Sequence, residues 1–518
     1  MPVSRNIIHH RLYFTGLLLL IAALPLSLFV MSIAQILLLA NWLAEGKLAV
    51  KLQQFFNNKL VLAFCLIYLV HVTGLLYTSD FDYALKDLRT KVPLLLLPLI
   101  ISTSDPISKN SRLTLIFLYI ASVLGGSIAS TCLYFTVEYS DIRYIFPYIS
   151  HIIFSLNVVL AIVLLAYLIA KPQKVFNIPK ILYYCLILWF IVFLFMAQSL
   201  TGIGILGGIS LVFLLHYLHS HLKLGLRLAA YTGVMFLLFL CIQFIHAQYK
   251  EFEQPEKIDF KTLDQFSQGG NPYYNDTSSK QIVNGHPLWI YICEPELRKA
   301  WNLRSHCPFD SMVKTGFDIK NVLFRYMTSR GLRKDSVGFY SLTDNEISHI
   351  ELACTDVRDL NDHGIAMRIR QVFWEIQNYS QNGNASGFSV MMRIEYWKAS
   401  LALISRNPIL GVGTGDMNTV FSEYYEETHA KLSPEWRRRS HNQYLSITVG
   451  LGIIGLFVFL FALFYPAFKL GQLRPGLFFC FLMILLLAML AEDTIESQAG
   501  VSFAAFFYCF FLFVPEEK

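Results

Sequence analysis

The feature that most limits the fold of this chain is the repeated occurrence of apolar runs long enough to cross a bilayer, a length of about 20 helical residues. Only 15% of the residues are charged, against about a quarter in a soluble protein. The sequence therefore predicts an all-α polytopic membrane protein with about twelve transmembrane helices. The expected spans are Leu12–Phe29, Val30–Ala44, Leu60–Tyr77, Val92–Ser104, Leu113–Phe135, Ile149–Ala170, Ile181–Gln198, Thr201–Tyr217, Leu228–Ile245, Leu445–Phe468, Leu477–Ala491 and Ala499–Val514.

The charges of the short loops predict the orientation, because cytoplasmic loops carry an excess of Lys and Arg. With Arg5 and Arg11 in the cytoplasm, both termini are cytoplasmic and the basic loops fall on one side, whereas the opposite loops carry acidic residues. The same excess explains the net charge of +6, so no nucleic-acid partner is expected. The basic loop residues are Lys47, Lys51, Lys59, Lys171, Lys174, Lys180, Lys223, Arg227, Lys469 and Arg474.

Three regions follow from this topology. Residues 1–246 form an N-terminal transmembrane bundle of about nine helices, and residues 442–518 form about three further spans. Between them, residues 247–441 form one large periplasmic loop domain of small helices and loops, with helices expected at Glu346–Tyr379 and Met391–Ser405. A disulfide among the three cysteines of this loop domain remains open.

The residues just before the tenth expected span combine a cluster of positive charge with a titratable ring. Arg437, Arg438 and Arg439 precede Ser440 and His441. A phosphate group could be neutralised by the arginines while the histidine acts as a base near neutral pH. The alternative is a basic anchor at the membrane surface. Because basic residues on the outer face oppose the usual charge bias, the functional reading is favoured.

Upstream of this cluster, Arg393 and Trp397 are four residues apart and share a face of an expected helix. An amphipathic helix explains this spacing better than a phosphate site does. The glycines at positions 411, 413 and 415 resemble a phosphate-binding loop, but no Lys-Ser or Lys-Thr follows them, so a tight turn is favoured.

Other polar residues stand near span ends. His151 begins an expected span, and Glu496 lies with two acidic neighbours between the last two spans. Such groups are candidates for function, but they often join helices. The basic stretch Arg325–Asp335 is interpreted as a solvated surface. No set of metal ligands is evident.

These motifs together resemble the O-antigen ligase family of bacterial envelope proteins. The resemblance rests on Arg393 with Trp397, on the N-P-I-L-G-V-G of Asn407–Gly413, and on the S-H-N-Q-Y-L that begins at Ser440. The E-S-Q-A-G that begins at Glu496 and the large loop before the last three spans fit it as well. The amino-acid sequence of the large loop resembles that of Bacteroidetes-type members.

The resemblance implies a GT-C-like, metal-independent glycosyltransferase without cofactors. Its donor would be a glycan on undecaprenyl diphosphate, and its acceptor the lipid A–core or another glycan, at the periplasmic face of the inner membrane. It implies that His441 deprotonates the acceptor hydroxyl and that Arg393 binds the donor diphosphate, with Asn442 beside the histidine. Direct displacement would invert the anomeric centre.

One position departs from the family pattern. Leu200 stands where family members commonly carry an Arg. Either a second diphosphate ligand comes from Arg143, Arg89 or the Arg437–Arg439 cluster, or this chain has a different substrate or weaker activity. Three alternatives remain: a polymerase of the same superfamily, a protein oligosaccharyltransferase, and a lipid-linked glycan transporter. A transporter would more often show internal repeats and charges deep in the spans, which this sequence lacks.

Overall fold

The computed structural model describes residues 2–137, 145–171, 178–253, 259–279, 281–312, 318–360 and 365–514. It is mostly helical, which confirms the polytopic all-α class. Seven helices of the described residues are long and apolar enough to cross a membrane. They are α2 (Leu28–Glu45), α4 with the 3-10 turn η1 (Lys59–Tyr77), α7 (Lys109–Thr136), α8 (His151–Ala170), α10 (Leu200–His221), α11 (Leu224–Glu253) and α19 (Gln443–Lys469).

Four shorter apolar helices accompany these seven, so the number of twelve stays a prediction. The two expected spans around Pro25 are separate helices, and the expected span at Val92–Ser104 is only the eleven-residue helix α6 (Pro93–Thr103), which is too short for a span of ordinary length. The four shorter apolar segments are Ile7–Ala23 of α1 (Pro2–Ala23), α9 (Lys180–Met196), α20 (Leu477–Ala491) and α21 (Gln498–Leu512).

Polar side chains cap the long helices where the apolar runs begin. The side chain of Ser27 accepts a hydrogen bond from the third residue of α2, and that of Ser150 does the same for α8. Asn58 caps α4 in the same way. Each cap satisfies backbone N–H groups that have no partner within the helix. The capped helices pack through one continuous apolar core, which includes residues of α1, α4, α8, α20 and α21.

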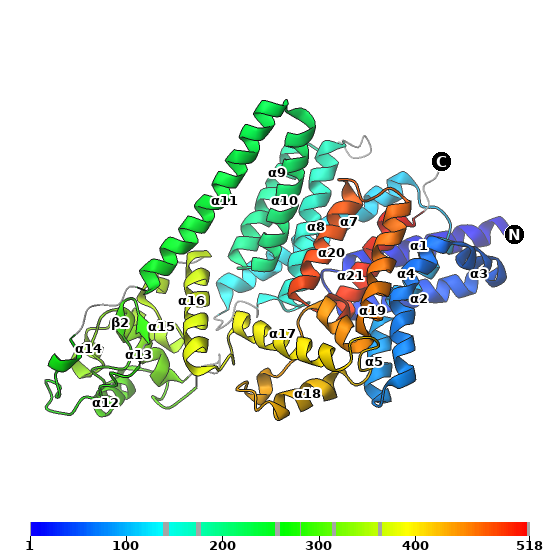
Figure 1. Ribbon diagram of the computed structural model, residues 1–518. Coiled ribbons are helices and arrows are strands. Elements are labelled where there is room, and N and C mark those ends of the chain that lie inside the picture. The colour runs from blue at the N-terminus through cyan, green and yellow to red at the C-terminus, as the bar shows by residue number, and fades with distance from the viewer. Residues whose placement is uncertain are drawn as a thin grey trace.

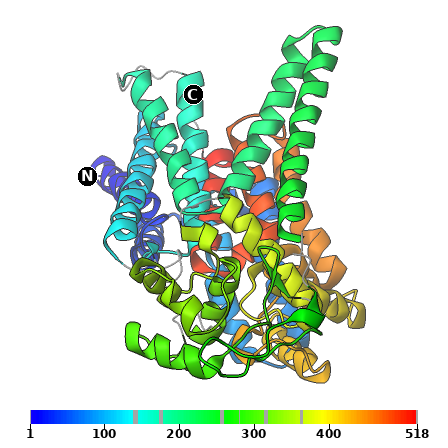
Figure 2. The ribbon, with the colours of Figure 1, turned by 90° about the vertical axis from the view of Figure 1, so that its left-hand side faces the viewer.

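The large insertion lies at one end of this bundle (Figures 1 and 2). The expected boundary at residue 246 falls inside α11, which continues to Glu253. The prediction of one long helix at Glu346–Tyr379 is wrong, because α15 ends at Glu351 and α16 begins at Ile365. The helices of the insertion are α12 (Glu294–Arg304), α13 (Ile319–Ser329), α14 (Ser336–Tyr340), α15 (Asp344–Glu351), α16 (Ile365–Asn382), α17 (Ser389–Arg406) and α18 (Met417–Glu427), with one short hairpin, β1 (Ile282–Val283) and β2 (His286–Pro287).

The insertion contains two apolar cores rather than one. The first joins α12, α13 and α15 around Trp301, which is fully buried. The second joins α17 and α18, and it includes Val449 of α19. The second half of the insertion therefore packs on the transmembrane bundle, as the position of α17 against α19 in Figure 1 shows.

Candidate functional site

A cavity of about 440 Å³ lies where the start of α8, the loop before α19 and the turn between α20 and α21 meet. We call it the bundle-end cavity. Residues far apart in the sequence line it, and five of them are candidates from the sequence: Arg437, Arg438, Arg439, His441 and Glu496. Its lining comprises Ser150, Ile153, Asn418, Arg437, Arg438, Arg439, His441, Glu492, Asp493, Glu496 and Ser497.

The backbone and ring of His441 are both fixed in this cavity. Its φ of 45° is left-handed, and its backbone N–H donates to Asp493 Oδ2 at 3.1 Å. Its Nδ1 lies 3.2 Å from Glu492 Oε1, and its ring stacks on Tyr396 of α17 with centroids 5.5 Å apart. When Nδ1 carries the proton and donates to Glu492, Nε2 is left as a proton acceptor. The side chain is 27% exposed, so a ligand can reach it.

The three arginines differ in how they are held. Arg439 lies 3.6 Å from Glu496 and over the ring of Tyr83. Arg437 donates through Nε to the carbonyl of Leu432 at 3.1 Å. Within the described ranges, neither Arg437 nor Arg438 forms an ion pair with a carboxylate. Their charge is therefore available to an anionic ligand, for which guanidinium groups are well suited.

A buried ionic network supports the floor of the cavity. Lys91, at the end of α5 (Phe81–Lys91), lies 2.8 Å from Glu496 and 2.5 Å from Asp87, and its side chain is 1% exposed. Gln443 also donates to Glu496, at 3.1 Å. Arg439 and Lys91 thus share one carboxylate, so the position of Arg439 depends on this network.

The pKa values of these carboxyl groups move in opposite directions. Burial raises the pKa of Asp87 to about 6, and the charge of Glu496 adds to the rise. Burial also favours a raised pKa for Glu496, but Lys91 and Arg439 outweigh it and hold the pKa of Glu496 well below its ordinary value. Burial, with the nearby Glu496, raises the pKa of Asp493. Glu496 is therefore the anion to which Lys91 and Arg439 are bound.

Arg393 does not line the cavity, but it lies beside one wall. Its Nε is 3.4 Å from the carbonyl of Ala491, the residue before Glu492, and its Nη1 is 3.3 Å from the carbonyl of Ser389. It stands one helical turn from Tyr396, which stacks on His441. Trp397 is 37% exposed on α17 and is not among the cavity residues.

The other predicted residues have structural partners or lie elsewhere. Asn442 caps α19 and donates to the carbonyl of Leu490. His151 Nε2 is 2.9 Å from the carbonyl of Ala197, so it connects α8 to the turn before α10.

One of the proposed substitutes for the missing family arginine, Arg89, does not line the cavity in this structure. Arg89 is exposed on α5 and is absent from the lining, so its contact with the diphosphate stays a prediction. Arg143 lies outside the described residues. Leu200 itself is 46% exposed.

The glycine-rich segment is a turn, as the sequence favoured. Gly411 and Gly413 have φ values of 71° and 98°. A Cβ on Gly411 would lie 2.4 Å from the carbonyl carbon of Gly450 in α19, so no side chain fits there. The segment packs on α19 where Gly452, with φ 65°, interrupts the helix. Backbone N–H groups of Val412 and Gly413 donate to carbonyls of α19 at this break.

Sequence reasoning missed Lys91 and Asp87, and it found no partner for the acidic residues near Glu496. The spacing of Asp87 and Lys91 was one available signal, because residues four apart share a helix face. Among the residues that the structure describes, no group of three or more His, Cys, Asp or Glu side chains is arranged to hold a metal ion.

Comparison with known proteins identifies a region that contains part of the site. Among curated proteins, no significant match to the sequence was found. The sequence profile of the O-antigen ligase family matches residues 351–460, which include α17, α18, the arginine cluster, His441 and the first part of α19. The resemblance drawn from the motifs is confirmed over this region, and this chain is a multi-pass membrane protein in which residues 351–460 match the O-antigen ligase family.

Proposed function

We propose that this protein transfers a glycan from undecaprenyl diphosphate to an acceptor hydroxyl at the periplasmic face of the inner membrane, with lipid A–core as the acceptor. One observation carries the proposal: the bundle-end cavity combines a carboxylate-bound His441 with Arg437 and Arg438, two cations that have no described carboxylate partner. A base and an anion-binding group are the two elements that this transfer needs.

In the proposed reaction, His441 Nε2 takes the proton of the acceptor hydroxyl, and Glu492 stabilises the imidazolium through Nδ1–H. The acceptor oxygen forms a bond to the anomeric carbon on the face opposite the diphosphate. The bond from that carbon to the diphosphate oxygen breaks, and the undecaprenyl diphosphate leaves with the electron pair. The anomeric centre is inverted.

The arginines stabilise the charge that develops on the leaving diphosphate. Arg437 and Arg438 contact it from the cavity, and Arg439 is held by Glu496. Arg393, beside the carbonyl of Ala491, adds positive charge that attracts the diphosphate of the donor. It also positions the wall of the cavity that carries Glu492. Guanidinium groups supply this stabilisation without a metal ion, and the requirement for a metal can be tested with a chelator.

The helix directions support the proposed orientation. The helices α8 and α19 both begin at the bundle-end cavity, so their last residues lie at the opposite end of the bundle. Those opposite ends carry Lys171 and Lys469, which favours a cytoplasmic location there. The cavity and the insertion then face the periplasm, where a translocated lipid-linked glycan would be presented.

The test is transfer by the purified protein in proteoliposomes that contain a glycan on undecaprenyl diphosphate and lipid A–core, without nucleotide sugar. We expect transfer to persist with a chelator. The substitution His441→Ala should lower the rate by about a hundred- to ten-thousandfold, the usual cost of removing a general base. The matched control His429→Ala, at an exposed histidine, should retain the parent rate.

Other outcomes separate the alternatives. Glycan joined only to a second lipid-linked glycan would identify a polymerase, and movement of the lipid without a new glycosidic bond would identify a transporter. A parent rate in His441→Ala would show that the histidine is not the base and that the basic loop anchors the chain at the membrane surface.

A further inference from the structure

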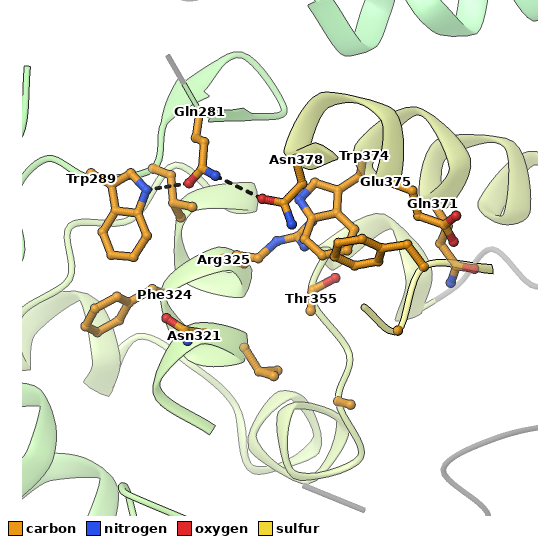
Figure 3. Close-up of a pocket in the computed structure, with 15 residues that line it drawn as sticks. Gln281, Trp289, Asn321, Phe324, Arg325, Thr355, Gln371, Trp374, Glu375 and Asn378 are labelled. Carbon is orange, nitrogen blue, oxygen red and sulfur yellow. Dashed lines mark hydrogen bonds between the residues drawn. The ribbon is translucent and has the colours of Figure 1, made fainter. Parts of the chain in front are cut away.

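A second cavity, of about 550 Å³, lies inside the insertion and shares no lining residue with the bundle-end cavity. We call it the insertion cavity. It is bounded by α13, by α16 and by the segment around the β1–β2 hairpin (Figure 3). Its volume falls within the range of roughly 300–1,000 Å³ that is typical of small-molecule sites.

Aromatic rings form two sides of the insertion cavity. Trp289 and Trp374 lie on opposite sides of it in Figure 3. The ring of Trp374 is fixed between the guanidinium of Arg325, 3.5 Å from the ring centroid, and the ring of Phe388, at 4.8 Å and 89°. Such rings offer flat apolar surface with a negative face, which attracts weakly positive C–H groups.

Amide groups line the space between the two tryptophans. The indole N–H of Trp289 donates to Gln281 Oε1, and Gln281 Nε2 donates to Asn378 Oδ1 at 3.1 Å. This chain of hydrogen bonds orients the amide of Gln281. Since an amide has two N–H donors and an oxygen that accepts twice, Gln281 retains capacity for a ligand.

The charges of the insertion cavity cancel. Arg325 and Glu375 are its only charged residues among the described lining, one of each sign. The interpretation of the Arg325–Asp335 stretch as solvated surface is therefore wrong. Arg325 packs on Trp374, and residues 326–329, Lys334 and Asp335 are buried. A cavity without surplus positive charge does not favour a diphosphate, whereas flat aromatic surface with oriented amides suits an uncharged ligand rich in both hydroxyl and C–H groups.

We propose that the insertion cavity binds an uncharged oligosaccharide segment of two to four sugars, with Trp289 against a sugar C–H face and Gln281 hydrogen-bonded to its hydroxyls. This assignment rests on the proposed function only for the source of the glycan, which is the polysaccharide that the bundle-end cavity transfers. The cavity holds the chain at a distance from the reacting sugar.

The experiment measures binding of lipid-free maltotriose, mannotriose and chitotriose to the full-length protein in detergent, by saturation-transfer NMR and by tryptophan fluorescence. At least one of the three should bind. Trp289→Ala should weaken its binding tenfold or more, and Gln281→Ala about fivefold, the cost of about one hydrogen bond. Gln281→Ala also guards against misfolding, because this side chain belongs to neither apolar core of the insertion. Inorganic pyrophosphate at the same concentration should not compete.

Three outcomes would overturn the assignment: no binding of any of the three sugars, equal binding by the parent and both variants, or displacement of the sugar by pyrophosphate. His441→Ala is the matched control, and it should bind the sugars as the parent does. Sugar binding without transfer by the parent would leave the insertion cavity assigned and reject the proposed function. Transfer without sugar binding would support the proposed function and reject the assignment of the insertion cavity.

Discussion

The bundle-end cavity and the insertion cavity are similar in size but differ in how their linings are stabilised. The first is lined by arginines, carboxylates and a histidine, and a buried ionic network holds Arg439 and Glu496 in place. The second is lined by indole rings and amides that neutral hydrogen bonds and stacking hold in place. The difference indicates a division of tasks. Charged residues line the bundle-end cavity, where the bond between the sugar and the diphosphate would break. Neutral residues line the insertion cavity, where a long glycan would need only weak contacts.

The largest effect is expected from breaking the network under the bundle-end cavity. Lys91→Met leaves Glu496 and Asp87 buried without their common cation. Removing one partner of a buried ion pair costs about 3–5 kcal/mol, so the unfolding midpoint in denaturant should fall markedly. Lys86→Met on the exposed side of α5 is the matched control. Equal midpoints for the two variants would show that the network is not required for stability.

A second change tests whether charge is the basis of the difference. The double substitution Arg437→Gln and Arg438→Gln should weaken binding of undecaprenyl diphosphate by about a hundredfold or more, because each hydrogen bond to a charged group contributes about 1.5–3 kcal/mol. Binding of neutral oligosaccharide in the insertion cavity should not change. The measurement is a titration of both ligands against the same purified variant. A parallel loss of sugar binding would mean that the two cavities are not independent.

A smaller effect should follow from altering the partner of the histidine. Glu492→Gln keeps the shape of the side chain but removes the charge that stabilises the imidazolium. Transfer should slow by about ten- to a hundredfold, the value of one charged hydrogen bond, while donor affinity stays within about twofold. Measuring KM and kcat separately distinguishes a slower transfer step from a loss of donor affinity. An unchanged kcat would exclude Glu492 from the proton transfer.

The smallest expected effect is a dependence of stability on pH. Because the pKa of Asp87 in the folded protein is raised to about 6, above its value in an unfolded chain, the folded protein holds this proton more tightly. The stability from Asp87 is therefore fully present below about pH 4, an unfolded-chain value, and is lost as the pH rises through about 6. Asp87→Asn should lack this change. Denaturant midpoints of both proteins between pH 4 and 7 provide the measurement, and parallel curves would contradict the assignment.

Several of these features could be predicted from the sequence because they are local. The apolar runs predict the membrane helices, and the order of Arg437–Arg439 and His441 before α19 predicts charge at a helix end. The sequence favours a turn at Gly411 and Gly413 because the glycines are not followed by the Lys-Ser or Lys-Thr of a phosphate-binding loop. Each of these inferences uses residues that are close in the chain, where periodicity and composition carry information.

The remaining features depend on contacts that no local pattern contains. Lys91 and Glu496 are 405 residues apart, so their ion pair could not be inferred. From the sequence, Arg89 and not Lys91 is a candidate. Two positions along a helix turn a side chain to another face, and the face of Asp87 and Lys91 is the buried one. Arg325 stands in a basic stretch, and its stacking on Trp374 depends on a helix that begins 40 residues later.

The interruption of α19 at Gly452 has a consequence for how the chain is made. A helix break at membrane depth leaves backbone groups that lipid cannot satisfy. Here Val412 N–H and Gly413 N–H donate to carbonyls before the break, and Ile453 N–H donates to Pro408 after it. The turn that emerges earlier from the ribosome thus completes a membrane helix that emerges later. Closure of the Gly411 turn and completion of α19 are therefore coupled steps in folding, and a chain whose Gly411 turn fails to close would be left with an incomplete helix.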